Sequence, residues 1–290
     1  MTSEELKEVQ HVDLEIAKYF VDFCRKHDLL CYFCGGGCIG TIRHKGFIPW
    51  DDDLDFFMPR ADYEKLKKLW KNSDDNRYAL VFPSKDYNDH NIFITIRDKK
   101  TTMIKTYQAD LEMVHGITVD VFPLDGCPAN KLSRKVQLFW GLVYQLYCAQ
   151  IVPQNHGKFV EIVGKVALNA IADPNKRYKV WKYAEKQMSK YSFDSAEKIT
   201  ELCAGPRYMR NMYPQKCFAK AVFKQFEDTQ MPIPVGYDKY LKMAFGEYMK
   251  LPPKEKRVTE HDAVLIDTKT PYTEYRYKYY LVGHRRKKNA

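Results

Sequence analysis

The sequence lacks the features that would place it across a membrane, outside the cell or among repetitive chains. It has no run of about 18 uncharged apolar residues, the length that crosses a bilayer, so no transmembrane helix is expected. The N-terminal segment MTSEELKEVQ is polar and acidic, which is not the pattern of a secretory signal. The chain also shows no internal repeat and no low-complexity linker. These absences predict a cytoplasmic protein.

A zinc-binding cysteine motif is missing as well. Cys31, Cys34 and Cys38 lie close together, but a zinc site needs four ligands and no second Cys-x-x-Cys follows. In a reducing compartment the eight cysteines are expected to be thiols. Because Cys31 and Cys34 fall within an apolar segment, we predict buried thiols there rather than metal ligands.

The composition is that of a globular protein with an excess of positive charge. Of the 290 residues, 45% are apolar and 29% charged, enough for a core in one large domain or two modest ones. Lys and Arg number 47, and Asp and Glu number 37, so the formal charge is +10. This excess favours an anionic partner. No stripe of basic and aromatic residues occurs in residues 1–125, so nucleic acid is not the partner we expect.

Hydrophobic patterns divide the chain into a mixed first part and a mostly helical second part. In the first part they predict helices at 4–28, 38–44 and 62–71, and strands at 29–34, 53–58, 78–82, 92–97 and 117–122. In the second part they predict helices at 131–152, 157–172, 178–191 and 237–246. The fold class is therefore α+β. We expect a mixed-sheet core at 1–127 and a mostly helical subdomain at 128–290.

A group of carboxylates interrupts this positively charged chain. Asp53 and Asp55 lie two residues apart on a predicted strand, so they share one face at a separation of about 6 to 7 Å. Carboxylates so placed repel each other unless a cation lies between them, and oxygen ligands suit Mg²⁺ or Mn²⁺. Asp120, a lone acid within another apolar strand, is a candidate third ligand. The alternative is a solvated acidic loop that binds no ion.

A glycine triplet precedes these acids in an arrangement typical of a phosphate cradle. Gly35-Gly36-Gly37 stands between an expected strand and a short helix, where the backbone can approach an anion and helix N–H groups can bind it. The helix ends in Arg43, His44 and Lys45, which are candidate phosphate ligands. A plain tight turn and compensation of the helix dipole are the alternatives.

The ordered series of glycine turn, basic triplet and acidic strand resembles the signature of the LicD family. The resemblance runs from Gly35 to Arg60, continues at Ile96-Arg97-Asp98-Lys99 and 116–126, and resumes at 245–253 and 256–261. LicD proteins are cytoplasmic transferases that move a CDP-linked phosphoalcohol, most often phosphocholine, onto cell-surface glycans. The family is similar to fukutin and fukutin-related protein. It belongs with nucleotidyltransferases of the DNA polymerase β type, which is the fold that the resemblance implies for the core.

The resemblance also implies roles for single residues. Asp53 and Asp55 would hold the metal ions, with Asp120 as the third acid and possible acceptor of the hydroxyl proton. Gly35-Gly36 would form the phosphate turn. Members usually carry Thr or Ser where this chain has Gly37, so a hydroxyl contact to phosphate is missing here.

Three further residues are candidates for the site. Trp50, beside the acidic loop, either offers an aromatic face to a quaternary ammonium or packs under the loop. His261 is a second candidate for the general base if 237–262 folds back onto the core, and is otherwise a structural histidine. Arg97 lies within a matched segment and is a candidate substrate ligand.

The resemblance predicts a metal-dependent phosphotransferase. A sugar hydroxyl of a glycan of the teichoic acid, capsule or lipopolysaccharide type, lipid-linked or polymeric, attacks the phosphorus that bears choline, and CMP leaves CDP-choline. CDP-ribitol and CDP-glycerol are alternative donors. A non-catalytic polyanion-binding protein is the alternative of another class.

Peripheral membrane contact is the remaining expectation. The apolar helix at 136–152 either docks on a membrane surface or packs within the helical subdomain. The basic tail Arg285-Arg286-Lys287-Lys288 favours an anionic surface. The +10 charge then suits a nucleotide donor, an anionic glycan and the inner face of a membrane.

Overall fold

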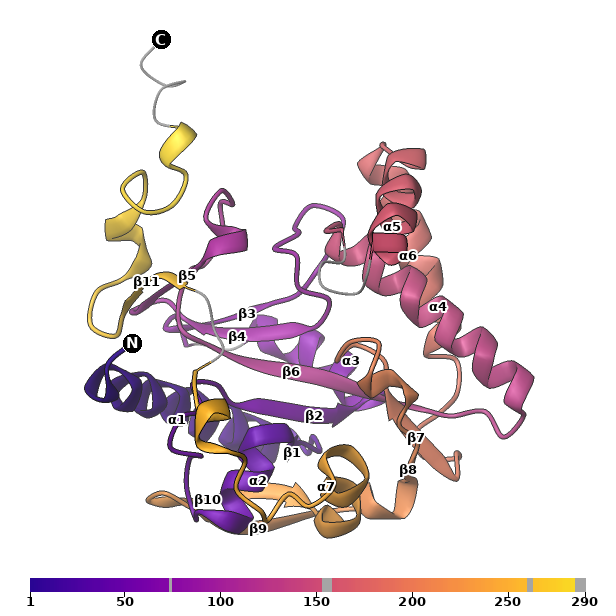
Figure 1. The fold of residues 1–290 in the computed structure, drawn as a ribbon, viewed down its shortest axis with the longest axis horizontal. Helices are drawn as coiled ribbons and strands as arrows, with labels where there is room; N and C mark the ends of the chain where they lie inside the picture. The colour runs from indigo at the N-terminus through magenta and orange to yellow at the C-terminus, as the bar shows by residue number, and fades with distance from the viewer. Residues whose placement is uncertain (73–74, 153–157, 260–262, 285–290) are drawn as a thin grey trace.

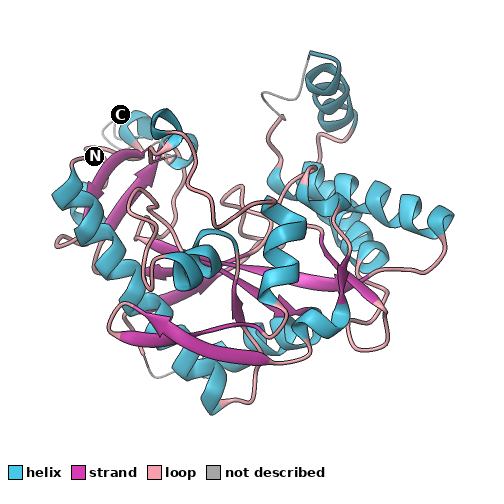
Figure 2. Ribbon diagram, turned by 60° about the horizontal axis from the view of Figure 1, so that its bottom comes forward, coloured by secondary structure: helices cyan, strands magenta, loops and turns pink. Residues whose placement is uncertain are grey.

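A mixed β-sheet forms the middle of the molecule, and helices lie around it (Figures 1 and 2). The computed structural model describes residues 1–72, 75–152, 158–259 and 263–284. The strands of the main sheet are β1 (Tyr32–Phe33), β2 (Asp55–Pro59), β3 (Tyr78–Val81), β4 (Ile94–Asp98), β6 (Thr118–Gly126), β7 (Lys198–Glu201) and β8 (Tyr213–Pro214). Their order is β1-β2-β6-β4-β3, and β7 joins β6 and β8. β2 and β6 are parallel, and the other neighbouring pairs are antiparallel.

Two short strand pairs and a set of helices complete the fold. The pairs are β5 (Thr102–Lys105) with β11 (Ala263–Asp267), and β9 (Ala221–Phe226) with β10 (Thr229–Pro234). The helices are α1 (Ser3–Lys26), α2 (Gly35–Arg43), α3 (Arg60–Leu69), α4 (Lys131–Ala149), α5 (Lys158–Ala170), α6 (Pro174–Met188) and α7 (Tyr237–Phe245). Together with the mixed sheet, they confirm the predicted α+β class. Among the described helices, none combines the length and apolar character needed to cross a bilayer.

Helix α1 lies across the sheet and supplies much of the core. Its start is set by a capping box, in which the Glu5 N–H donates to Thr2 Oγ1 at 3.2 Å and the Thr2 N–H donates to Glu5 Oε2 at 2.7 Å. The apolar stripe that the sequence predicts, with Val9, Ile16 and Phe20, is buried. This stripe packs against β4, β6 and β10, so α1 covers the face behind the central strand.

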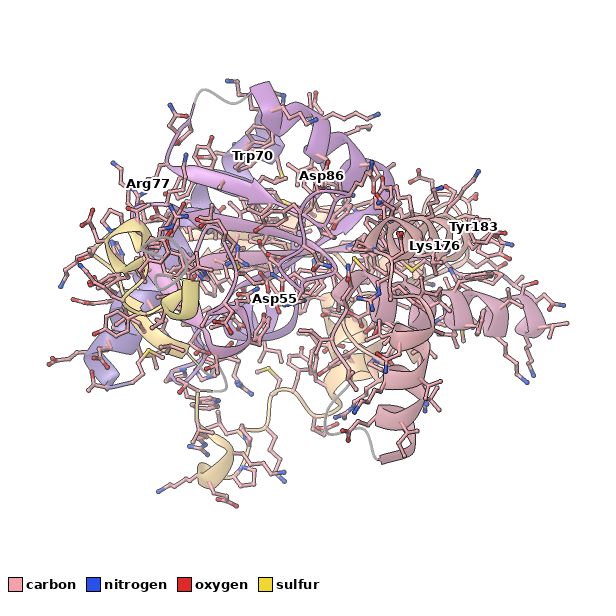
Figure 3. All side chains as sticks on the ribbon, turned by 90° about the horizontal axis from the view of Figure 1, so that it is seen from above. Asp55, Trp70, Arg77, Asp86, Lys176 and Tyr183 are labelled. Carbon is pink, nitrogen blue, oxygen red and sulfur yellow. The ribbon has the colours of Figure 1, made fainter. Side chains whose placement is uncertain are left out.

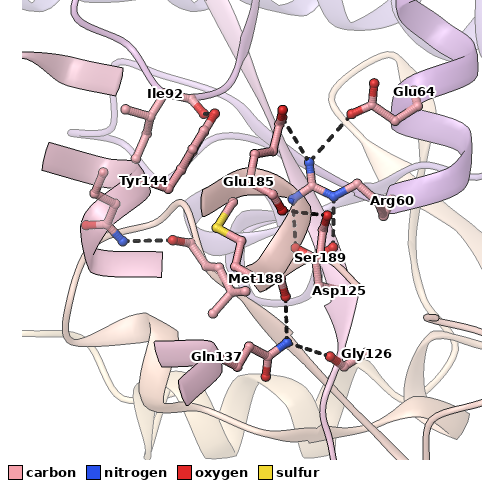
Figure 4. Close-up of polar contacts among 12 residues, drawn as sticks. Arg60, Glu64, Ile92, Asp125, Gly126, Gln137, Tyr144, Glu185, Met188 and Ser189 are labelled. Atoms are coloured by element: carbon pink, nitrogen blue, oxygen red, sulfur yellow. Dashed lines mark hydrogen bonds and ion pairs between the residues drawn. The ribbon is translucent and has the colours of Figure 1, made fainter. Parts of the chain in front are cut away.

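Helices α4 to α6 stand at one end of the sheet, on the right in Figure 1. Their attachment includes buried polar contacts, because α4 carries polar side chains on its inner face (Figure 4). The amide of Gln137 donates to the carbonyl oxygens of Gly126 at 2.8 Å and Met188 at 2.9 Å. The hydroxyl of Tyr144 donates to the Ile92 carbonyl oxygen at 2.7 Å. These bonds tie α4 to α6 and to the end of β6.

The second part of the chain differs from the expected helical subdomain. Beyond residue 128 it is helical as far as Met188. β7 to β11 follow, and the predicted helix at 237–246 is present among them as α7. β7 joins the same sheet as the first part, so the predicted boundary at 127/128 does not separate two layers. The patterns missed these strands because β7 and β8 are very short and β10 carries Pro232 and Pro234, which argue against a strand.

Smaller differences concern where elements begin. The glycine triplet is the first turn of α2 rather than a turn before it. Helix α6 begins at Pro174, which the sequence pattern treated as a break. Asp173 caps this helix, since its Oδ1 accepts the Lys176 N–H at 2.8 Å, and proline is well suited to the first helical position.

Candidate active site

Two of the predicted acids meet on neighbouring strands. Asp55 begins β2, and its register partner on the parallel strand β6 is Asp120. The Asp120 N–H donates to the Leu54 carbonyl oxygen at 3.2 Å, so the pairing extends one residue further. Leu54 and Phe56 are buried, which confirms that the acids and the apolar residues alternate between the two faces. Asp53 precedes the strand by two residues, and Asp55 lies in the middle of the molecule (Figure 3).

The negative charges of neighbouring acids make it harder for Asp55 to ionise. We call Asp51, Asp52, Asp53, Asp55 and Asp120 the acidic cluster. Burial, followed by the negative charges of Asp53 and Asp120, raises the pKa of Asp55 well above its usual range. The positive charge of Lys105, at the end of β5, partly offsets this rise. The negative charges of the acids thus outweigh the positive charge of Lys105 at this site.

The donor atoms of the acidic cluster fit a divalent cation. Within the described ranges, no three Asp, Glu, His or Cys side chains are already gathered as a complete ligand set. Mg²⁺ beside a nucleotide commonly takes one or two carboxylates and completes its shell with water and phosphate oxygens. Asp53 and Asp55, with Asp120 next to Asp55, supply hard oxygen atoms of that kind. The residues present therefore suit Mg²⁺ or Mn²⁺.

The first two glycines of α2 lie against the acidic cluster. Gly35 has a left-handed backbone, with φ +49°, and the preceding Cys34 N–H donates to the Asp55 carbonyl oxygen at 3.0 Å. A Cβ atom on Gly36 would lie only 2.0 Å from Asp51 Oδ2, so a side chain at this position would displace the carboxylate. We call α2 the glycine helix. Its glycine triplet brings the N-terminus of this helix to the carboxylates.

Gly37 faces the other way. A Cβ atom on Gly37 would approach the Phe33 ring to 3.2 Å, and the residue is buried. A serine or threonine here would start towards the core rather than towards the acidic cluster. A Ser or Thr hydroxyl at position 37 would therefore not start on the side of the acidic cluster, so Gly37 costs the cluster no such contact.

The basic triplet divides into three environments. The Arg43 Nη1–H donates to the Tyr248 carbonyl oxygen at 2.6 Å, and its Nε–H donates to His44 Nε2 at 2.9 Å. Burial and the charge of Arg43 lower the pKa of His44, which favours its neutral form. Lys45 is exposed, with φ +62°. Arg43 thus fastens the late segment to the glycine helix, and Lys45 projects towards solvent.

Trp50 and Arg97 each contact another side chain. The guanidinium carbon of Arg257 lies 5.5 Å from the Trp50 ring centroid and covers one face of that ring. Arg97 is buried and its Nη2–H donates to Asp89 Oδ2 at 3.2 Å, an ion pair that holds β4 to the neighbouring loop. His261 lies outside the described residues, so its predicted role stays a prediction.

A cavity of about 450 Å³ opens beside the glycine helix and Asp55. Six aromatic side chains line it, and we call it the aromatic cavity: Phe57, Phe93, Phe122, Tyr208, Tyr240 and Phe245. The Gly35 N–H donates to the Tyr240 hydroxyl at 3.1 Å, which places α7 against the glycine helix. Glu201 also lines the cavity, whereas Trp50 is not among its described lining residues. The sequence analysis did not single out this cavity.

Comparison with known proteins shows a similarity to the LicD family. Residues 29–137 match the family model described as LicD/FKTN/FKRP, nucleotidyltransferase domain, and this segment contains both the glycine helix and the acidic cluster. The lipopolysaccharide cholinephosphotransferase LicD of Haemophilus influenzae is 27% identical over 272 residues, which span 88% of this chain and 96% of that protein. The chain is thus similar to the LicD family over residues 29–137 and to this cholinephosphotransferase over most of its length. The recognition made from the motif residues is thereby confirmed.

Asp13 is a residue near this site that the sequence analysis missed. It lies on α1 with 1% of its surface exposed, and neither carboxyl oxygen accepts a hydrogen bond from a described residue. Burial and then the negative charge of Asp53 raise its pKa well above the usual range, so Asp13 lies behind the acidic cluster. The available signal was its spacing, because Asp13 follows Val9 by four residues on the apolar stripe.

Gln10 is a second residue that the sequence analysis missed. Its Nε2–H donates to the Asp51 carbonyl oxygen at 2.8 Å and to the Ile48 carbonyl oxygen at 3.4 Å. These bonds hold the loop that carries the acidic cluster against α1. A polar residue on a half-buried helix face gives no sequence signal for such a contact, because its partners are backbone atoms about forty residues away.

Proposed function

We propose that this LicD-family phosphotransferase transfers phosphocholine from CDP-choline to a sugar hydroxyl of a lipopolysaccharide-type glycan and releases CMP. The observation that carries the proposal is the pairing of Asp55 with Asp120 on parallel strands beside the glycine helix. The same layout supports a nucleotidyltransferase core of the DNA polymerase β type. The name of the 27% identical relative favours choline and lipopolysaccharide over ribitol, glycerol, teichoic acid or capsule.

The proposed cofactor is Mg²⁺ or Mn²⁺, held by Asp53 and Asp55 with Asp120 beside them. A divalent cation there supplies neutralisation of the phosphate charge during an in-line displacement. The glycine helix points its N-terminus at the same place, where its dipole and backbone N–H groups favour a phosphate. Lys105 adds a positive charge near Asp55.

The proposed step exchanges one phosphorus–oxygen bond for another. The acceptor hydroxyl oxygen forms a bond to the phosphorus that bears choline, and the bond from that phosphorus to the bridging oxygen of the donor breaks. The electron pair of the broken bond leaves with CMP. Asp120 is the proposed acceptor of the hydroxyl proton, because it lies at the edge of the acidic cluster and is partly exposed.

A donor panel tests the function. We expect the purified protein to release CMP from CDP-choline when Mg²⁺ or Mn²⁺ and a lipopolysaccharide acceptor are present, and to stop when EDTA removes the cation. CDP-ribitol and CDP-glycerol should release CMP far more slowly. Chromatographic measurement of CMP decides the matter. Faster release from CDP-ribitol would reassign the donor, undiminished release in EDTA would refute the metal, and no release from any donor would favour polyanion binding.

We further propose that helices α4 and α5 rest on an anionic membrane surface. Both expose apolar side chains: Leu132, Val136, Phe139 and Leu142 on α4, and Ile162, Val163 and Val166 on α5. The exposed lysines Lys131, Lys135 and Lys165 stand among them, against the single exposed acid Glu161. Apolar side chains flanked by lysines suit the boundary between anionic headgroups and acyl chains.

A flotation assay tests this contact. The wild-type protein should float with vesicles that contain phosphatidylglycerol and stay behind with neutral vesicles. Replacing Leu132 and Phe139 by Ser should reduce the floating fraction several-fold, because apolar insertion is lost. Phe223→Ser, at an exposed phenylalanine on β9, is the matched control and should float normally. Absence of wild-type binding to anionic vesicles would refute the membrane contact.

A further inference from the structure

The aromatic cavity has a continuous wall of rings. Consecutive ring centroids lie between 4.3 and 6.4 Å apart, in the order Phe93–Phe122, Phe122–Phe57, Phe57–Tyr240, Tyr240–Phe245 and Phe245–Tyr208. Phe57 and Tyr240 are buried, whereas Phe245 is 36% exposed. The wall therefore joins buried rings to an exposed phenylalanine.

Glu201 adds a buried acid to this wall. Only 3% of its surface is exposed, and its Oε1 accepts the Tyr213 hydroxyl hydrogen at 2.5 Å. Burial, opposed by the hydrogen bonds from Tyr213 and Asn211, raises the pKa of Glu201 to about 8. Throughout the described part of the chain, no lysine or arginine forms an ion pair with Glu201. At neutral pH a carboxyl group with this pKa is largely protonated, and a bound cation would favour its charged carboxylate form.

We propose that the aromatic cavity binds the quaternary ammonium group of the donor, with Glu201 as its counter-charge. This assignment rests on the proposed function and adds the residues that select the alcohol. Aromatic faces attract a cation through the ring quadrupole, and three methyl groups fill apolar space without requiring hydrogen bonds. A primary ammonium group would need acceptors for its N–H hydrogens, and the ring faces offer none of ordinary strength.

The position of the cavity agrees with one bound phosphocholine group. Gly35, Gly36 and Asp55 line one part of it, which is where the phosphate is proposed to lie. Glu201 and Phe245 line it as well, and they would face the ammonium group. A volume of about 450 Å³ holds both groups, within the range of small-molecule sites. The phosphorus would then lie at the acidic cluster while the aromatic rings fix the choline.

The experiment separates the effect of the positive charge of choline from the effect of its shape on donor binding. The ligands are CDP-choline, CDP-ethanolamine and the neutral 3,3-dimethylbutyl analogue of CDP-choline, which has the shape of choline without its charge. Binding is measured by calorimetry with Mg²⁺, and turnover by CMP release. Glu201→Gln removes the charge and keeps an acceptor for Tyr213, and Phe245→Leu removes one exposed ring. Glu197→Gln and Phe223→Leu, both exposed, are the matched controls.

We expect the wild-type protein to favour CDP-choline over the neutral analogue and over CDP-ethanolamine. Glu201→Gln should reduce the preference for the charged donor over its neutral analogue about tenfold. Phe245→Leu should weaken the binding of CDP-choline about threefold to fivefold. Inhibition by CMP should stay unchanged in both variants, and the two controls should match the wild type. CMP binding reports directly whether a variant retains its folded nucleotide site.

Two results would overturn the inference. If both variants keep the wild-type preference for the charged donor, the aromatic cavity does not bind the ammonium group. If both variants weaken the binding of CMP as much as the binding of CDP-choline, the cavity binds the nucleotide instead. Failure of the proposed function looks different: the wild-type protein would bind CDP-choline more tightly than its neutral analogue and yet release no CMP.

Discussion

Replacing Asp53 or Asp55 by Asn should lower cation-dependent CMP release from CDP-choline by about a thousandfold or more, since a bound cation contributes several kcal/mol. Each substitution removes a carboxylate from the acidic cluster while keeping the side-chain size. Asp55 is the register partner of Asp120, so its loss also removes the pairing of acids across β2 and β6. The measurement is the steady-state rate of CMP release at saturating Mg²⁺.

The stability of these variants separates a catalytic effect from unfolding. Burial and then repulsion by Asp53 and Asp120 raise the pKa of Asp55, so neutralising one of these acids should leave the cation-free protein at least as stable as the wild type. Mg²⁺ should raise the melting temperature of the wild type but not that of the variants. Asp28→Asn, at an exposed aspartate beyond α1, is the control and should behave as the wild type. Full activity of Asp53→Asn would contradict the assignment of the metal ligands.

Replacing Asp125 by Ala should lower the free energy of unfolding by about 3 to 5 kcal/mol, because Arg60 loses its two-point partner and keeps only the more distant Glu64 and Glu185. Asp125 is fully buried on β6, where its carboxylate accepts the Nε–H of Arg60 at 2.8 Å and the Nη2–H at 2.7 Å (Figure 4). Arg60 begins α3 and also approaches Glu185 of α6 at 3.8 Å. The pair thus links three elements at the end of the sheet. Urea denaturation measures the change.

Two further variants establish that the charge pair is responsible. Asp22→Ala breaks an exposed pair with Arg25 on α1, at 3.6 Å, and should cause no measurable change. The double replacement Arg60→Met and Asp125→Leu removes both charges and should recover most of the lost stability, since no buried charge is then left alone. If Asp125→Ala unfolds at the same urea concentration as the wild type, the pair does not stabilise the fold as we expect.

Local features of the sequence were sufficient for the elements with strong periodicity. The apolar spacing around Val9, Ile16 and Phe20 predicted α1, and the alternation of Leu54 and Phe56 with the acids predicted the geometry of β2. The lone acid Asp120 was placed correctly in a strand beside them. These predictions succeed because burial of one face imposes a period on the residues of a single element.

The later strands are elements that such patterns do not predict. β7 spans only Lys198–Glu201, and β9 and β10 form a hairpin whose second strand contains two prolines. The pairing of β7 is decided by a neighbour far away in the chain, since it pairs with the end of β6. A short segment carries too few residues to express a period, and cross-strand packing overrides its own preference.

The sequence by itself determined the similarity to the LicD family, the α+β class and the group of acids beside the glycine helix, because each depends on residues close together in the chain. Only the tertiary structure decided which distant side chains join them. It placed Asp13 behind the acidic cluster and brought Glu201 and Phe245 to the cavity beside Asp55. The physical reason is that a buried charge or an aromatic wall is a property of packed surfaces, which no spacing along one element records.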